Sequence, residues 1–275
     1  MADTDEGKDW IFLSDAHFTR ENRDNQDRLI RFLEGERENV GGLVLLGDLF
    51  EFWFGFEGYV YREYVPILEQ LESLSHRGVR IKYIEGNHDF CLGPVFKEQL
   101  RAEVHAEEME ENLGGKRVYI AHGDRVNPRD YEYRLFRRAV KTRFTYALIR
   151  GAGPALSKTV ANWLSARSRR KNHERSPRHI PLFRAFARNK FREGVDVVIL
   201  GHSHYPEEIL ESIDGREKAY FNVGDWITFY SYLRYRPKTG FELCYYDDRR
   251  RSRDNPTSFC TFPIPRHVHL GKIPD

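Results

Sequence analysis

The stretch Leu43-Val44-Leu45-Leu46-Gly47-Asp48 joins a short apolar run to a glycine and a carboxylate. A run of this length that ends at glycine predicts a buried strand. The pattern of an apolar run followed by metal-binding side chains recurs four times along the chain. These are residues 10–13 before Ser14-Asp15-Ala16-His17, residues 81–84 before Gly86-Asn87-His88-Asp89, residues 118–120 before Ala121-His122-Gly123-Asp124, and residues 195–200 before Gly201-His202-Ser203-His204. Because sheets of the α/β type bind ligands where their strands end, we expect the five blocks to form one site.

Seven side chains of these blocks are candidate metal ligands: Asp15, His17, Asp48, Asn87, His122, His202 and His204. A single histidine after a strand is more often a core or loop residue, but five such blocks in one chain favour a dinuclear metal centre. Oxygen and nitrogen donors without thiolate indicate an open hydrolytic site for two divalent ions, with Mn²⁺ first and Fe or Zn²⁺ as alternatives. Two metals about 3.5–4 Å apart can generate hydroxide at neutral pH and clamp both oxygens of a displacement at phosphorus.

The spacing of the candidate ligands predicts how they are shared. Asp15 and His17 are separated by one residue, as are His202 and His204. In an extended backbone the side chains of such a pair point the same way, so each pair could bind metal from one side. Asp48 is the carboxylate that we expect to bridge both ions through its two oxygens, and this role makes it essential for catalysis.

His88 is not needed as a ligand and is the predicted catalytic acid. It could donate a proton or a hydrogen bond to the leaving oxygen, with Asp89 orienting its ring. The alternative is that His88 only hydrogen-bonds to neighbouring groups of the site. Asp124 and Asp225 are expected to support the site rather than to bind metal.

In their order along the chain, the five blocks resemble those of the calcineurin-like metallophosphoesterases. The shared motifs are Asp-x-His, Gly-Asp, Gly-Asn-His-Asp, His-Gly-Asp and Gly-His-x-His. The resemblance covers roughly residues 9–232. It implies the α+β class, with a layered αββα sandwich, and hydrolysis of a phosphate ester or anhydride at two metals.

A closer resemblance is to the UDP-2,3-diacylglucosamine diphosphatases of bacterial lipid A synthesis. It rests on residues 47–53, on residues 86–93 and on the long insert between His122 and His202. It implies cleavage of a UDP-linked diacylated glucosamine lipid into UMP and 2,3-diacylglucosamine 1-phosphate. Many of those diphosphatases carry Arg where this chain has His88, and this departure leaves the exact substrate open.

By their positions in the motifs and in the insert, seven residues are expected to contact the substrate. They are Asn87, His88, Asp130, Tyr133, Ser168, Lys171 and Arg175. Lys171 or Arg175 could contact the nucleotide phosphate, and an arginine would do so with two parallel hydrogen bonds.

Residues 9–128 and 193–248 are expected to form the metallophosphoesterase core, residues 129–192 a basic helical lid, and residues 249–275 an irregular tail. Apolar residues at helical spacing from Tyr131 to Leu148 predict one helix of the lid. Gly151-Ala152-Gly153-Pro154 predicts a break, and a shorter helix is expected to follow as far as Lys171. These apolar residues could be core, or they could form a lid that takes acyl chains.

Charge is concentrated in the lid. The segment from Arg125 to Arg192 holds 19 lysines and arginines against three acids, which indicates an anionic partner. A phospholipid surface, a pyrophosphate substrate and nucleic acid all fit that charge, and basic amphipathic helices can lie on an anionic membrane. No recognised nucleic-acid motif is present, so nucleic acid is not expected, and no protein partner is predicted.

The remaining features predict a cytoplasmic protein in peripheral contact with the inner membrane. The first eight residues are polar and acidic rather than signal-like, and no apolar run approaches 18 residues. Cys91, Cys244 and Cys260 are odd in number and far apart, which indicates reduced thiols. The rival to the lipid reading is a phosphodiesterase or nucleotide pyrophosphatase of the same superfamily that acts on a soluble substrate.

Overall fold

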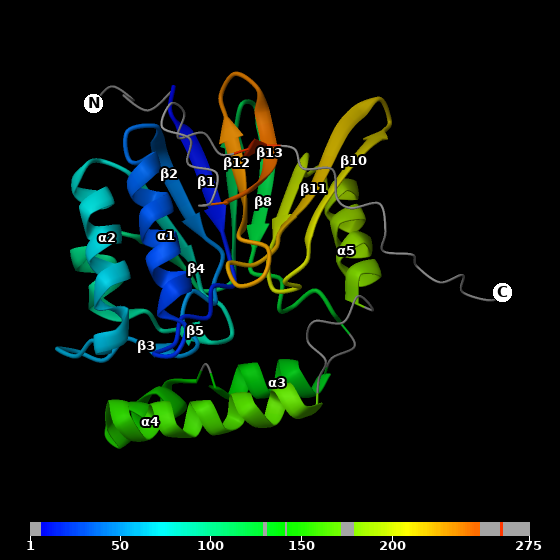
Figure 1. Cartoon of the computed structure of the whole chain (residues 1–275). Helices are drawn as coiled ribbons and strands as arrows, with labels where there is room; N and C mark the ends of the chain where they lie inside the picture. The colour runs from blue at the N-terminus through cyan, green and yellow to red at the C-terminus, as the bar shows by residue number, and fades with distance from the viewer. Residues whose placement is uncertain (1–6, 129–130, 141, 172–178, 248–258, 261–275) are drawn as a thin grey trace.

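The computed structural model describes residues 7–128, 131–140, 142–171, 179–247 and 259–260 of the 275-residue chain. Within these ranges two β-sheets lie face to face, with α1 and α2 outside one sheet and α5 outside the other (Figure 1). This layered αββα arrangement confirms the expected α+β class. Helices α3 and α4 lie below the two sheets in Figure 1, and α4 packs against the core cluster of the larger sheet through Tyr146 and Ile149.

The larger sheet has the strand order β14-β13-β12-β1-β2-β4-β6, and the smaller has the order β10-β11-β9-β8-β7. The larger sheet consists of β1 (Asp9–Leu13), β2 (Val40–Leu45), β4 (Arg80–Ile84), β6 (Glu103–His105), β12 (Ser231–Arg236), β13 (Gly240–Tyr245) and β14 (Phe259–Cys260). The smaller consists of β7 (Glu108–Leu113), β8 (Lys116–Ala121), β9 (Val197–Leu200), β10 (Pro206–Ile213) and β11 (Arg216–Val223). The short strands β3 (Trp53–Phe54) and β5 (Asp89–Phe90) pair in parallel. All five apolar runs that precede metal-binding blocks are strands.

Three helices cover the sheets. They are α1 (Arg23–Glu36), α2 (Val65–His76) and α5 (Ile180–Arg192), and two short turns, η1 (Arg62–Tyr64) and η2 (Val95–Gln99), lie beside the larger sheet. Helix α2 ends two residues before Gly78. Gly78 has a φ of 90°, and the N–H of Val79 turns back to the carbonyl of Leu74 at 3.1 Å.

The core is divided by the sheets, and β1 shows why its run is apolar throughout. Ile11 and Leu13 pack under α1 and α2, whereas Trp10 and Phe12 face the smaller sheet. Alternate residues of a strand point to opposite faces, so a strand covered on both sides has no position for an exposed polar residue. The buried strands therefore fix where the polar loops at their ends must emerge.

Two hairpins of the smaller sheet have tight turns that contain glycine. The β7–β8 hairpin turns at Gly114-Gly115, and the β10–β11 hairpin turns at Asp214-Gly215. All four residues have positive φ, as tight hairpin turns require. Strand β13 pairs antiparallel with β12 in the larger sheet, because the chain crosses between sheets after β11.

The predicted limits of the lid and of the tail need correction. Residues 129–192 were assigned to the lid, but Phe183, Ala187 and Phe191 of α5 pack in the core cluster over the smaller sheet. An amphipathic helix looks the same in sequence whether it covers a lid or a sheet, so its partner could not be deduced. In the tail, Phe259–Cys260 forms a strand against β13, and the other residues from 248 onward lie outside the described part.

The lid has two helices, α3 (Tyr131–Val140) and α4 (Arg143–Lys171). The expected break occurs at Gly153, where φ is 77° and ψ is 169° within α4. A further break between Val140 and Arg143 divides the helix that was predicted to continue to Leu148. Among the described helices, none is both long and apolar enough to cross a bilayer.

Candidate metal centre

The five polar blocks meet at one edge of the paired sheets, because backbone hydrogen bonds join their loops. The N–H of Asp15 donates to the carbonyl of Gly47 at 3.2 Å, and the N–H of His17 donates to the carbonyl of Asp48 at 2.9 Å. On the smaller sheet, the N–H of Gly201 donates to the carbonyl of His122 at 2.9 Å. Loops from different parts of the chain are thus held side by side.

The backbone at the site is left-handed rather than extended. Asp15, His17, Asp48, His202 and His204 have φ values of 54°, 43°, 54°, 66° and 61°. Residues other than glycine rarely adopt this conformation, and such strain clusters at functional sites. The expectation that each i, i+2 pair binds on one side from an extended chain is therefore wrong in its premise. For His202 and His204 the conclusion is also wrong, because the two side chains lie in different groups of potential ligands.

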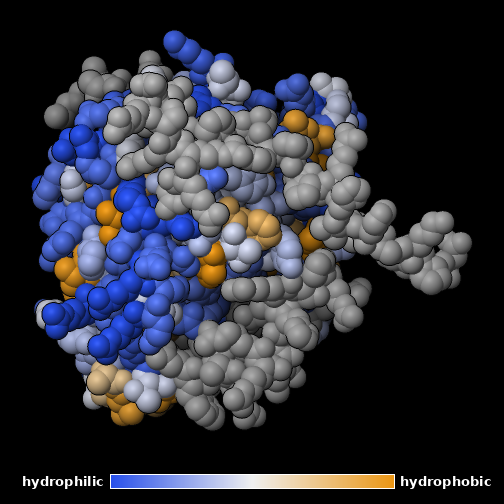
Figure 2. All heavy atoms as spheres, in the orientation of Figure 1, coloured by the Kyte–Doolittle hydropathy of each residue, from blue (hydrophilic) through white to orange (hydrophobic). Residues whose placement is uncertain are grey.

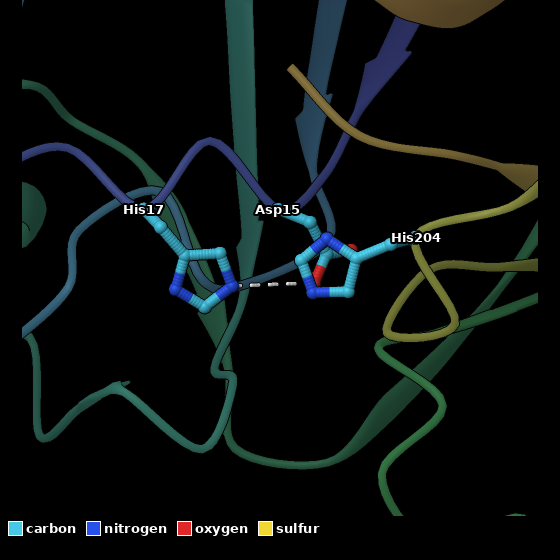
Figure 3. Close-up of side chains that lie close together, drawn as sticks. All are labelled: Asp15, His17 and His204. Carbon is cyan, nitrogen blue, oxygen red and sulfur yellow. Dashed lines mark ion pairs between the residues drawn. The ribbon is translucent and has the colours of Figure 1, made fainter. Parts of the chain in front are cut away.

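One group of potential ligands consists of Asp15, His17 and His204 (Figure 3). Oδ1 of Asp15 lies 3.7 Å from Nε2 of His17 and 3.6 Å from Nε2 of His204. The two imidazole rings stack with centroids 5.2 Å apart. Within the described residues, Asp15 Oδ1 and His17 Nε2 are buried without a hydrogen-bond partner. Such buried, unsatisfied polar atoms are costly, and a bound cation between them would remove the cost.

A second group consists of Asp48, His122 and His202. Nδ1 of His122 donates to the carbonyl of Leu46 at 2.6 Å, which leaves Nε2 as the nitrogen that could bind a cation after losing its proton. That Nε2 lies 3.1 Å from Nδ1 of His202 and 3.1 Å from Oδ1 of Asn87. The structure therefore places Asn87 with this group, and it separates His202 from His204.

Asp48 lies between the two groups. Its Oδ2 is 3.4 Å from Nε2 of His122 and 3.7 Å from Nε2 of His17. Its other oxygen, Oδ1, accepts the backbone N–H of His88 at 2.9 Å. A carboxylate in this position is within reach of a cation in either group.

Electrostatics at the centre favour the binding of cations. Burial alone would raise the pKa of Asp48, but His122, His88 and His17 hold that pKa well below its usual range. Burial alone would lower the pKa of His122, yet the Asp48 carboxylate outweighs it and raises the pKa to about 10. The pKa of His17 is likewise raised well above its usual value, against its burial, by Asp15 and Glu51. Without metal, His17 and His122 therefore hold an extra proton at neutral pH, whereas burial and the neighbouring His122 lower the pKa of His202.

A cation must displace these protons, so metal affinity should rise with pH. We expect the dissociation constant for Mn²⁺ to fall between about pH 6 and pH 9, with net proton release on binding. Calorimetric titrations in two buffers of different ionisation enthalpy would measure that release. Equal heats in both buffers and an affinity independent of pH would contradict the electrostatic account.

Asp89 was expected to orient the ring of His88, but it does not. Its carboxylate accepts hydrogen bonds from the backbone N–H groups of Asp48 at 3.0 Å, Leu49 at 2.8 Å and Gly86 at 3.0 Å. Burial and the neighbouring Asp48 raise the pKa of Asp89 to about 7, and the hydrogen bonds it accepts oppose the shift. Asp89 therefore shapes the loop that presents Asp48.

The ring of His88 is held by the main chain of Glu51. Nδ1 of His88 lies 2.8 Å from the carbonyl oxygen of Glu51, and its side chain is 13% exposed. The carboxylate of Glu51 reaches His17 as well, at 3.3 Å from Nδ1. Sequence reasoning missed both contacts, although Glu51 belongs to the 47–53 motif that carries the closer resemblance.

Asp225 and Asp124 were predicted to support the site rather than to bind metal, and their contacts agree with that role. Oδ2 of Asp225 lies 3.3 Å from Nδ1 of His204, which turns Nε2 of that ring toward Asp15. Asp124 pairs instead with Arg137 of α3, with Oδ2 at 2.7 Å from Nε. This ion pair connects the lid to the loop that carries His122, and it was not anticipated.

The structure does not test the predicted substrate contacts of the insert. Tyr133 belongs to α3, and Ser168 and Lys171 belong to the last part of α4. Asp130 and Arg175 lie outside the described residues. Only Asn87 and His88 of that set are placed at the metal centre.

The apolar residues of the lid are divided between core and surface. Tyr146 and Ile149 pack against the core cluster, where Tyr146 stacks on Phe90 with centroids 6.3 Å apart. Six others are exposed: Tyr131, Leu135, Phe144, Leu148, Leu156 and Val160. Figure 2 shows apolar side chains gathered at the lower left of the molecule, where α4 lies. The lid is therefore attached to the sandwich by one face and presents apolar residues on others.

Comparisons with known proteins agree with this geometry. The sequence model of the calcineurin-like phosphoesterase family matches residues 11–206. A Porphyromonas gingivalis protein named UDP-2,3-diacylglucosamine hydrolase is 32% identical over 246 residues, covering 80% of this chain and 91% of the relative. An Aeromonas hydrophila protein of the same name is 29% identical over 230 residues, covering 82% and 94%. A solved phosphoesterase from E. coli overlaps 86% of this chain and 91% of its own with 18% identity and a TM-score of 0.43, which is too low to carry any argument.

Proposed function

Because this chain belongs to the calcineurin-like phosphoesterase family, we propose that it hydrolyses the pyrophosphate bond of UDP-2,3-diacylglucosamine. The products would be UMP and 2,3-diacylglucosamine 1-phosphate. The observation that carries the choice of substrate is a basic lid with exposed apolar residues, attached beside a centre built to hold two cations. The relatives that bear this name align over most of the chain, which supports the choice.

We assign the two metal ions to the two groups of side chains. Asp15, His17 and His204 would hold one ion, and Asn87, His122 and His202 the other, with Asp48 shared. When bound, two divalent ions supply an activated nucleophile and neutralise charge on the phosphate. The oxygen and nitrogen donors fit Mn²⁺, Fe or Zn²⁺.

His88 would act on the leaving group. A carbonyl oxygen can only accept, so Nδ1 of His88 carries the proton that it donates to Glu51. Its Nε2 is then the atom left to meet the substrate, and the partial exposure of the ring permits contact. In the doubly protonated imidazolium form, Nε2 would also carry a proton, and donating a hydrogen bond or that proton would stabilise the oxygen that departs with UMP or with the lipid phosphate.

The lid would bind the remainder of the lipid. Exposed apolar residues on α3 and α4 suit hydrocarbon chains, and the excess positive charge of the segment suits the two phosphates. Asp130, Tyr133, Ser168, Lys171 and Arg175 remain proposed contacts to the nucleotide and sugar.

The acyl chains should dominate discrimination between substrates. Each buried methylene contributes about 0.8 kcal/mol, so burying four contributes about 3 kcal/mol, or roughly 10²-fold. We expect kcat/KM for UDP-2,3-diacylglucosamine to exceed that for UDP-N-acetylglucosamine by at least this factor. Phe144→Asp and Leu148→Asp should narrow the difference, whereas Leu210→Asp, an equally exposed change on β10, should not. Equal rates on both substrates would leave a general phosphoesterase for soluble substrates.

The same lid face would lie on an anionic membrane, in line with a cytoplasmic protein in peripheral contact. Apolar side chains beside basic ones bind such surfaces through buried area and attraction to acidic head groups. Sedimentation with vesicles containing phosphatidylglycerol should carry the protein down at low salt, and Phe144→Asp should reduce the bound fraction while Leu210→Asp leaves it unchanged. Binding that is indifferent to Phe144→Asp would refute contact through this face.

A further inference from the structure

Glu51 lies between the two histidines that face the centre from the larger sheet. A backbone bridge joins Phe18 to Phe50, and the N–H of Glu51 donates to the carbonyl of Phe18 at 3.1 Å. This pairing brings the loop after β2 against the loop after β1. The side chain of Glu51 is 14% exposed, so its carboxylate interacts largely inside the protein.

Two different parts of Glu51 contact the two rings. Its carboxylate Oε2 lies 3.3 Å from Nδ1 of His17, and its carbonyl oxygen lies 2.8 Å from Nδ1 of His88. The rings themselves meet edge to face, with centroids 4.7 Å apart. One residue therefore contacts the candidate metal ligand through its carboxylate and the candidate acid mainly through its carbonyl, with the other carboxylate oxygen, Oε1, 4.0 Å from Nδ1 of His88.

These contacts decide which nitrogen of each ring is available. Both Glu51 oxygens accept, so each histidine carries a proton on Nδ1. Nε2 of His17 is then the nitrogen left to bind a metal, 3.7 Å from Asp15 Oδ1 and 3.7 Å from Asp48 Oδ2. A carboxylate behind a metal-binding imidazole fixes the ring and makes it a stronger donor, and its loss typically costs 10–100-fold in metal affinity.

We propose that Glu51 is the positioning residue that sets both histidines, holding His17 for one metal through its carboxylate and His88 for the leaving oxygen through its carbonyl. The proposal rests on the metal and acid assignments above and not on the identity of the lipid. It gives the 47–53 motif a purpose beyond Asp48, because the same short loop then supplies the shared carboxylate and the group that orients its neighbours.

Glu51→Gln separates the two functions, since it removes the charge and keeps the carbonyl. We expect one of the two Mn²⁺ sites to weaken by roughly 10–100-fold, measured from the spin-resonance signal of free Mn²⁺ during titration. Glu57→Gln, an exposed change shortly after the 47–53 motif, is the control and should leave both Mn²⁺ affinities unaltered.

The proton positions can be read directly. Long-range ¹H–¹⁵N spectra of the Zn²⁺-loaded protein should show Nδ1 protonated in both His17 and His88, with only the His17 pattern changed by Glu51→Gln. If Glu51→Gln does not fold, the spectrum of the unaltered protein still shows whether Nδ1 of His17 and of His88 carries a proton. A proton on Nε2 of His17, or unaltered Mn²⁺ affinities in a folded Glu51→Gln, would overturn the proposal. Two tight Mn²⁺ sites without turnover of the lipid would instead count against the proposed substrate and leave Glu51 in place.

Discussion

Asp48→Ala is expected to lower hydrolysis on the order of 10³-fold or more, because several kcal/mol of charge stabilisation depends on the metals. The carboxylate lies within 4 Å of His17 on one side and His122 on the other, so its loss removes a ligand from both groups. Metal content and turnover should fall together. Elemental analysis of the purified variant, beside steady-state rates at several Mn²⁺ concentrations, would measure both.

Asp48→Asn is the matched control for local structure. It removes the charge but keeps an oxygen that can accept the N–H of His88. We expect Asp48→Asn to lose metal and turnover nearly as completely as Asp48→Ala, with circular dichroism unchanged in both. Near-normal turnover with two metals still bound would contradict a bridging role for this carboxylate.

His88→Asn should retain both metals and lose roughly 10²–10⁴ in turnover, the usual contribution of a positioned acid or base. Its backbone N–H would still donate to Asp48, so the variant changes the ring and not the loop. Rates and Mn²⁺ titrations on the same preparation would separate the two effects.

His88→Arg supplies the second arm of that experiment. A guanidinium can also donate hydrogen bonds to a leaving oxygen. We therefore expect His88→Arg to retain more turnover than His88→Asn. Since His17, Asp48 and His88 also form a group able to hold a cation, a collapse of metal occupancy in His88→Asn would make His88 a ligand instead.

The sequence predicted the five strands and the polar block after each, because buried strands are apolar on both faces and the blocks interrupt them. It could not predict how His202 and His204 would divide between the two groups. That division follows from left-handed backbone at both residues, and residue spacing alone implies an extended chain. The strained conformation is set by the surrounding loops and not by the local sequence.

The contacts that support the site also could not be predicted from the sequence. Asp89 holds the Asp48 loop across 41 residues of sequence, and Arg137 of the lid pairs with Asp124. Neither contact follows from residue spacing. The predicted C-terminal limit of the lid was wrong for a related reason. The apolar stripe of α5 packs on the smaller sheet, and nothing in its periodicity distinguishes that from packing on α4.

The central claim is that one carboxylate joins two metal ions held by loops from both sheets. Anomalous diffraction from crystals equilibrated with Mn²⁺ tests it most directly. The account predicts two peaks about 3.5–4 Å apart, one beside Asp15, His17 and His204 and one beside Asn87, His122 and His202, with Asp48 contacting both. A single peak, or two peaks that do not share Asp48, would contradict it.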